Sequence, residues 1–127
     1  MIPLTFRDAL VFVELDVTYR GQTLHLSDIL LDTGSRGTLI SVEAVESIGL
    51  EGELTDTIRK IFGVGGVEYV IEKTVDSVTL AGVTVSNFAV ELGKMNYGFV
   101  INGIVGLDLL RAVRATIDLD ALALLAK

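Results

Sequence analysis

Apolar and polar residues alternate along most of this chain, with the period at which successive side chains of a β-strand point to opposite faces. The clearest example is 13–19, where the odd positions are apolar and the even ones polar. Thirteen glycines make sharp turns available between strands, and there is only one proline. The pattern predicts an all-β chain of about nine short strands, arranged as a small barrel or sandwich. Short helices are expected at 42–48, capped by Ser41 and ended by Gly49, and at 107–113.

Length and charge narrow the class of protein. A chain of 127 residues fits one domain, 1–127, with a core of ordinary size. Ten basic and 17 acidic residues give a net charge of −7, which disfavours nucleic acid and anionic membranes as partners. The longest apolar runs, 9–13 and 121–126, are too short to span a bilayer. Because 50% of the residues are hydrophobic, we expect surplus apolar surface in a core or against another subunit.

The residue inventory limits the chemistry. There is no cysteine, which excludes disulfides, thiolate catalysis and cysteine-based metal centres. His25 is the only histidine, and because Leu24 and Leu26 flank it we expect it on the solvent face of a strand rather than in a catalytic triad. The first residues lack the features of a signal peptide, so we expect a cytoplasmic protein. Carboxylates remain as candidate catalytic groups.

Asp32 occupies the most informative position among the acidic residues. Three apolar residues, 29–31, precede it and Thr33-Gly34-Ser35 follow, so the side chain leaves a buried strand and enters a polar turn. An ordinary surface hairpin can contain Asp-x-Gly, but it does not need apolar residues on both sides, and here Leu39-Ile40 follow soon after. The flanks therefore indicate a half-buried carboxylate, an environment typical of catalytic acids.

A second segment, 101–110, leads from an apolar strand through Ile104-Val105-Gly106 into a helix. Together the two segments resemble the retropepsin-like aspartic proteases, the single-domain family that includes the retroviral proteases. The order agrees over nearly the whole chain: an N-terminal hairpin, the Asp-Thr-Gly turn, a glycine-rich hairpin around 64–66, the apolar-apolar-Gly element, a helix and a terminal strand. The resemblance implies a small closed β-barrel with one or two short helices and aspartic endopeptidase activity.

Aspartic proteases use two carboxylates side by side, whereas this chain has one Asp-Thr-Gly motif. The resemblance therefore implies a homodimer in which the two copies of Asp32 meet at the two-fold axis. The pair would share one proton, and its ionised member would activate a water that attacks a peptide carbonyl of a polypeptide substrate. This mechanism requires no metal and no cofactor.

The resemblance also assigns roles around Asp32. Thr33 would bond across the axis, Gly34 would accept a substrate NH, and the Ser35 hydroxyl would bond to Asp32 unless it merely caps the turn. The flap that closes over a bound peptide would be formed by Val64, Gly65 and Gly66. Apolar subsites would be lined by Phe62, Val64, Val67, Ile104 and Val105.

One departure from the retroviral pattern concerns charge. Arg36 stands where those enzymes have an acidic residue, and the next helix begins Leu107-Asp108 where they have a basic one. We hypothesise a charge-reversed ion pair between Arg36 and Asp108 that ties the active-site loop to the helix. The alternative is two solvated surface charges, since exposed pairs are weak.

Two other functions fit the sequence. The same dimeric fold can serve as a peptide-binding or assembly domain with little or no hydrolysis, although such a domain need not retain Asp32. An acidic β-barrel with a coincidental turn motif is the other interpretation, and it predicts a monomer. For the protease, we expect the apolar segment 121–126 to be an edge strand that pairs with the partner subunit.

Overall fold

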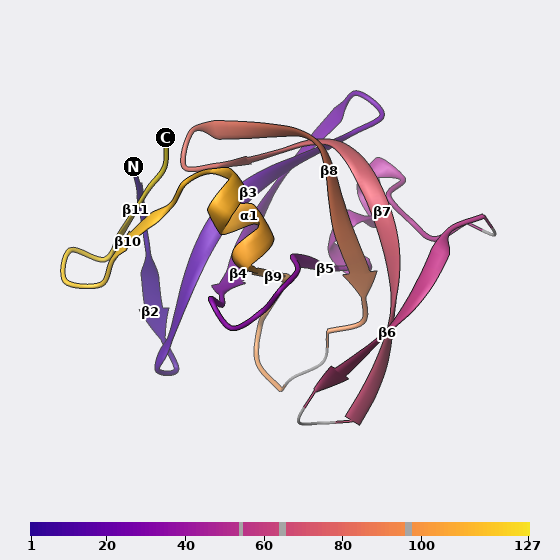
Figure 1. Ribbon diagram of the computed structural model, residues 1–127, viewed down its shortest axis with the longest axis horizontal. Coiled ribbons are helices and arrows are strands. Elements are labelled where there is room, and N and C mark those ends of the chain that lie inside the picture. Colours follow the sequence, from indigo (N-terminus) through magenta and orange to yellow (C-terminus); the bar gives the residue numbers. More distant parts are fainter. Residues whose placement is uncertain (54, 64–65, 96–97) are drawn as a thin grey trace.

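The computed structural model describes residues 1–53, 55–63, 66–95 and 98–127 (Figure 1). Strands dominate it, as the alternation predicts. They are β1 (Ile2–Pro3), β2 (Thr5–Arg7), β3 (Leu10–Tyr19), β4 (Gln22–Leu31), β5 (Leu39–Ser41), β6 (Thr57–Gly63), β7 (Gly66–Leu80), β8 (Val83–Gly93), β9 (Gly103–Val105), β10 (Thr116–Asp118) and β11 (Ala123–Leu125). The helices are a 3-10 helix, η1 (Glu43–Ile48), and α1 (Leu107–Ala112).

The strands close into a ring, which confirms the expected barrel. β3 pairs with β4, β4 with β9, β9 with β5, β5 with β8, β8 with β7, and β7 returns to β3. The pairs β4–β9 and β5–β8 are parallel, whereas the other pairs of the ring are antiparallel. β2 and β6 lie outside the ring, on β3 and β7 respectively. A closed ring leaves few free strand edges, which protects the barrel from edge-to-edge association.

The alternation along β3 places one face in the core. Leu15 and Val17 are buried there, whereas Glu14 and Asp16 of the same strand face outward. His25 of β4 lies beside these two acids on the outer face, with Nε2 3.0 Å from Glu14 Oε1 and Nδ1 2.6 Å from Asp16 Oδ1. Its hydrogen bonds, first to Glu14 and then to Asp16, raise the pKa of His25 above its usual value. The expected solvent-facing histidine is confirmed.

Two local expectations need correction. Ser41 does not cap a helix: it ends β5, where its NH donates to Asn102 O at 2.9 Å, and η1 has Val42 as N-cap with no side-chain bond. Ser41 thus belongs to β5 and lies one residue before the N-cap position of η1. Gly49 does end η1, with φ +73°. β7 and β8 each run without a break where the sequence suggested shorter strands, because they pair with each other along nearly their whole common length.

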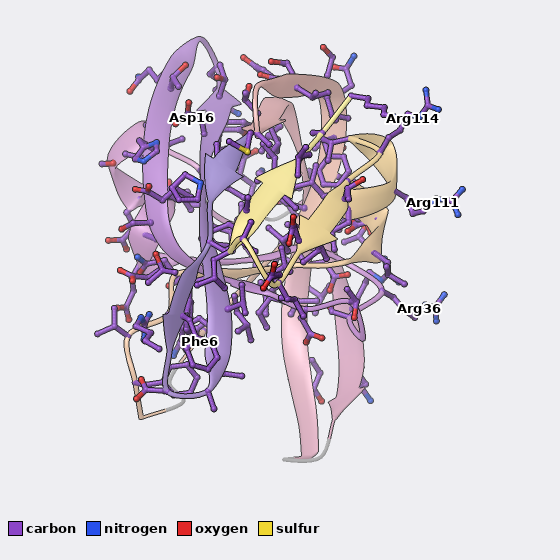
Figure 2. All side chains as sticks on the ribbon, turned by 90° about the vertical axis from the view of Figure 1, so that its left-hand side faces the viewer. Phe6, Asp16, Arg36, Arg111 and Arg114 are labelled. Carbon is purple, nitrogen blue, oxygen red and sulfur yellow. The ribbon has the colours of Figure 1, made fainter. Side chains whose placement is uncertain are left out.

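The chain termini form a separate sheet with the order β1-β11-β10, which faces the viewer in Figure 2. Leu124 of β11 pairs with Ile2 on one side and with Ile117 on the other, and its side chain is fully buried. The expectation that 121–126 forms an edge strand is therefore wrong. Its neighbours come from the same chain, and the outer strands of this sheet are β1 and β10. Among the described residues, no helix is long and apolar enough to cross a membrane.

The terminal sheet predicts opposite outcomes for two adjacent leucines. Leu124→Ala removes a side chain that is 0% exposed, and we expect it to lower the free energy of unfolding by about 3 kcal/mol. Leu125→Ala, at a position that is 41% exposed, should cost less than about 1 kcal/mol. Urea denaturation followed by circular dichroism measures both. Equal losses would contradict the in-chain placement of β11.

Candidate active site

Asp32 lies at the point where β4 leaves the barrel. The last residues of β4 pair in parallel with β9, and the Asp32 NH continues this ladder by donating to Val105 O at 3.0 Å. The chain then turns sharply, with Ser35 NH donating to Asp32 O at 3.1 Å. Backbone bonds from both sides thus fix the position of the aspartate, and its side chain is half-buried as the flanking residues indicated.

The turn itself orients the carboxylate. Gly34 NH donates to Asp32 Oδ1 at 2.9 Å, and a Cβ on Gly34 would lie only 3.2 Å from that oxygen. A glycine therefore allows the backbone to come close to the carboxylate. Thr33 and Gly34 are exposed, and the Thr33 hydroxyl makes no hydrogen bond within the part of the chain that the structure describes.

The Ser35 hydroxyl does not bond to the carboxylate of Asp32. It donates to Gly37 O at 2.8 Å, so the turn-capping alternative is correct. This bond holds the second half of the loop, 35–37, in a compact form. Within one subunit, the carboxylate of Asp32 is thus oriented by Gly34 and not by Ser35.

The predicted ion pair between Arg36 and Asp108 is absent among the described residues. Asp108 accepts hydrogen bonds from Thr38 Oγ1 at 2.8 Å, Thr38 NH at 3.2 Å and Leu109 NH at 2.8 Å. Three donors already satisfy this carboxylate, whereas the guanidinium of Arg36 points away into solvent (Figure 2). An arginine gains little from an exposed pair compared with full hydration, which explains the outcome.

At Gly106, the loop 32–38 crosses the start of α1. A Cβ there would overlap the carbonyl oxygen of Gly37 and approach its carbonyl carbon to 2.7 Å. Leu107 NH donates to Ser35 O at 2.8 Å, so backbone hydrogen bonds join the loop to the first turn of the helix. The apolar-apolar-Gly element predicted from the sequence is therefore a close approach of two backbones.

The two residues before Gly106 differ in exposure. Ile104 is half-buried, but Val105 is completely buried in the core. Val105 thus cannot line a substrate subsite as expected; it supports Asp32 through its carbonyl oxygen.

The glycine-rich hairpin is present as β6 and β7, which pair from Thr57↔Glu72 to Gly63↔Gly66. In Figure 1 it projects beyond the barrel at the bottom of the view. Gly66 begins β7, whereas Val64 and Gly65 of the expected flap tip lie outside the described residues, as do the side chains of Phe62 and Val67.

Two residues of the site were missed by the sequence analysis. Thr38 is 1% exposed, and its hydroxyl donates to Asp108 and accepts from Gly106 NH at 3.2 Å. Glu91 of β8 lies behind the loop, where burial raises the pKa of its carboxyl group. A Cβ on Gly37 would lie 2.6 Å from Glu91 Oε1. Neither residue carries a signal in its local sequence, because its partners are more than 50 positions away.

The contacts of Asp108 predict which side chains are energetically coupled. In a double-mutant cycle, Asp108→Ala and Thr38→Val should be coupled by about 1 kcal/mol of unfolding free energy, because they share a hydrogen bond. Asp108→Ala and Arg36→Ala should be additive. Thermal or urea denaturation of the single and double variants measures both cycles, and coupling only in the second cycle would contradict the structure.

Comparisons with known proteins agree with this geometry. Residues 15–109 match the family model described as aspartyl protease. The fold is similar to the crystal structure of a retropepsin-like aspartic protease from Rickettsia conorii, with a TM-score of 0.68 and 19% sequence identity over 98% of this chain and 97% of that one. A comparison with curated proteins gave no significant match. The family match spans most of the chain and includes both the Asp32 turn and Gly106, so the chain belongs to the aspartyl protease family, with a retropepsin-like fold.

Proposed function

We propose that this protein is an aspartic endopeptidase whose catalytic dyad consists of Asp32 from two identical chains. The observation that carries the proposal is the turn at 32–34. It presents a half-buried carboxylate, oriented by the Gly34 NH at 2.9 Å, directly after the end of β4. This strand pairs with β3 on one side and with β9 on the other. One chain has one such motif, so a second copy must supply the second carboxylate.

In the proposed reaction the two carboxylates share one proton, because two negative charges so close together repel each other. The ionised Asp32 removes a proton from a water held between them, and the water oxygen forms a bond to the peptide carbonyl carbon. The protonated Asp32 stabilises the oxyanion. When the C–N bond breaks, a proton passes to the leaving amine, and the dyad returns to its starting state.

The surface around the terminal sheet supports dimerisation. Large apolar side chains are exposed on or near this sheet: Met1, Phe6, Leu119, Leu122 and Leu125. The terminal sheet and Phe6 face the same side of the molecule in Figure 2. Apolar side chains gathered on one side of a small protein favour a protein–protein contact. In the proposed dimer the exposed Thr33 hydroxyl bonds to the partner subunit, which aligns the two turns.

The substrate is proposed to lie between the Asp32 turns and the β6–β7 hairpins. Val64, Gly65 and Gly66 form the flap tip in this proposal, and the Gly34 carbonyl accepts a backbone NH of the substrate. The half-exposed Ile104 offers an apolar contact next to the site.

Substitution of the catalytic group tests the activity. Asp32→Asn keeps the size of the side chain but removes the acid, so we expect cleavage of casein or of a peptide library to fall by at least about a thousandfold. Asp76→Asn changes an exposed aspartate beside Gly21, at the opposite end of β4 from Asp32, and serves as the control. Pepstatin should inhibit the wild-type protein. A dimer without cleavage at any pH between about 3 and 7 would instead support a peptide-binding or assembly domain.

Mixing experiments test the shared dyad. When wild-type and Asp32→Asn chains are mixed in equal amounts and allowed to exchange, about a quarter of the dimers carry two carboxylates. Compared with the same total amount of wild-type protein, we therefore expect the mixture to show about a quarter of the activity. If the site were built within one chain, the mixture would retain about half. Light scattering on the same samples should give the mass of two chains, and a monomer that cleaves substrate would contradict the proposal.

A further inference from the structure

We propose that Arg36, Arg111 and Arg114, named here the basic strip, bind an acidic segment of the polypeptide substrate outside the cleft. This inference rests on the proposed protease function and specifies the class of substrate. All three side chains are exposed and extend from the same side of the molecule (Figure 2). None of them makes an ion pair with the described residues.

Other arginines of the chain differ in this respect. Arg7 pairs with Asp28 at 3.1 Å, Arg20 with Glu53 at 3.0 Å and Arg59 with Glu72 at 2.7 Å. Three of the six arginines thus pair with a carboxylate among the described residues, and the three arginines of the basic strip do not, although the chain carries 17 acidic residues. The nearest acid on α1, Asp108, is bound to Thr38 and Leu109 NH. The basic strip therefore remains available to an anionic ligand.

The backbone orders the three arginines along α1. Arg36 lies at its start, because Asp108 NH donates to Arg36 O at 3.3 Å. Arg111 lies in the last turn, and Arg114 follows the helix end with its NH donating to Arg111 O at 3.1 Å. From 108 to 114 a helical rise gives about 9 Å, which an extended peptide covers in about three residues. Three acidic residues at alternate positions of an extended peptide span about 13 Å, and the long arginine side chains can cover the remaining difference of about 4 Å.

The strip begins in the active-site loop. Arg36 is four positions after Asp32, and Ser35 O and Arg36 O both bond to the first turn of α1. A polypeptide bound along α1 can thus continue toward the Asp32 turn. A short acidic segment also suits the rest of the surface, because a longer polyanion would extend beyond the strip onto a protein of net negative charge. This favours a peptide over nucleic acid.

Binding is measured with Asp32→Asn chains, which hold a peptide without cleaving it. Two fluorescent peptides share one apolar core and differ in a flank with three alternate glutamates or three glutamines. By anisotropy at about 0.1 M salt, we expect the acidic peptide to bind about fivefold more tightly, and the difference to vanish at about 1 M. Equal binding at low salt would overturn the proposal.

Variants in the same background locate the contact. Arg111→Gln with Arg114→Gln should abolish the preference for the acidic flank, and Arg111→Lys with Arg114→Lys should retain most of it. Arg20→Gln lowers the charge at an exposed arginine that pairs with Glu53, away from α1, and should leave the preference unchanged. Circular dichroism confirms that each variant is folded. Persistent preference in the double glutamine variant would overturn the assignment to these residues.

Two further outcomes separate the hypotheses. If the wild-type protein binds both peptides equally and cleaves both with equal kcat/KM, the binding role of the basic strip is refuted and the protease proposal stands. If the acidic peptide binds preferentially but neither peptide is cleaved, the protease proposal is refuted and the basic strip stands as a binding site for acidic peptides. A single-stranded oligonucleotide of the same charge that binds as tightly as the acidic peptide would overturn the assignment to a polypeptide.

Discussion

The hydrogen bonds between Asp108 and Thr38 are the interaction on which the site depends. They join the residue directly before β5 to the first turn of α1, 70 positions later. They also satisfy a hydroxyl that is almost completely buried. A buried hydroxyl without a partner would cost about 1–3 kcal/mol, so the loop and the helix stabilise each other only in this arrangement. Gly106 allows the two backbones to touch at the same place. The position of Asp32 follows from this crossing and from the ladder to β9.

The distribution of charge around the loop separates two kinds of carboxylate. Asp108 and Glu91 lie behind the loop, where Asp108 is surrounded by donors and burial raises the pKa of Glu91. Asp32 lies in front, bonded by one backbone NH and open on its other side. Asp108 therefore has structural partners within the chain and Glu91 is partly buried, whereas Asp32 retains the accessible oxygen that chemistry at this site would need.

The sequence predicted the features that depend on local pattern. Alternation predicted the β3–β4 hairpin and the outward position of His25, and the order of motifs predicted the family and the barrel. It did not predict contacts between distant segments. The Arg36–Asp108 pair was inferred by reversing the charges of the retroviral pattern, but Thr38 offers Asp108 a buried donor that no local rule identifies. Ser35 was likewise assigned to the nearest acid, although Gly37 O is the acceptor in reach. Pairing within the terminal sheet depends on the path of the whole chain, so the placement of β11 could not be read from its apolar composition.

The terminal sheet affects how the proposed dimer would assemble and become active. Because β11 pairs with two strands of its own chain, formation of the terminal sheet does not require a strand from a second copy. For the proposed dimer, formation of this sheet and association of two subunits are then separate events, and a lone subunit carries only one of the two carboxylates. Activity would require two subunits to associate. At low abundance, the concentration of active dimer, and with it the rate of proteolysis, would therefore rise with the square of the protein concentration. In the proposed dimer, the amount of protein would therefore be one factor that sets the rate of proteolysis.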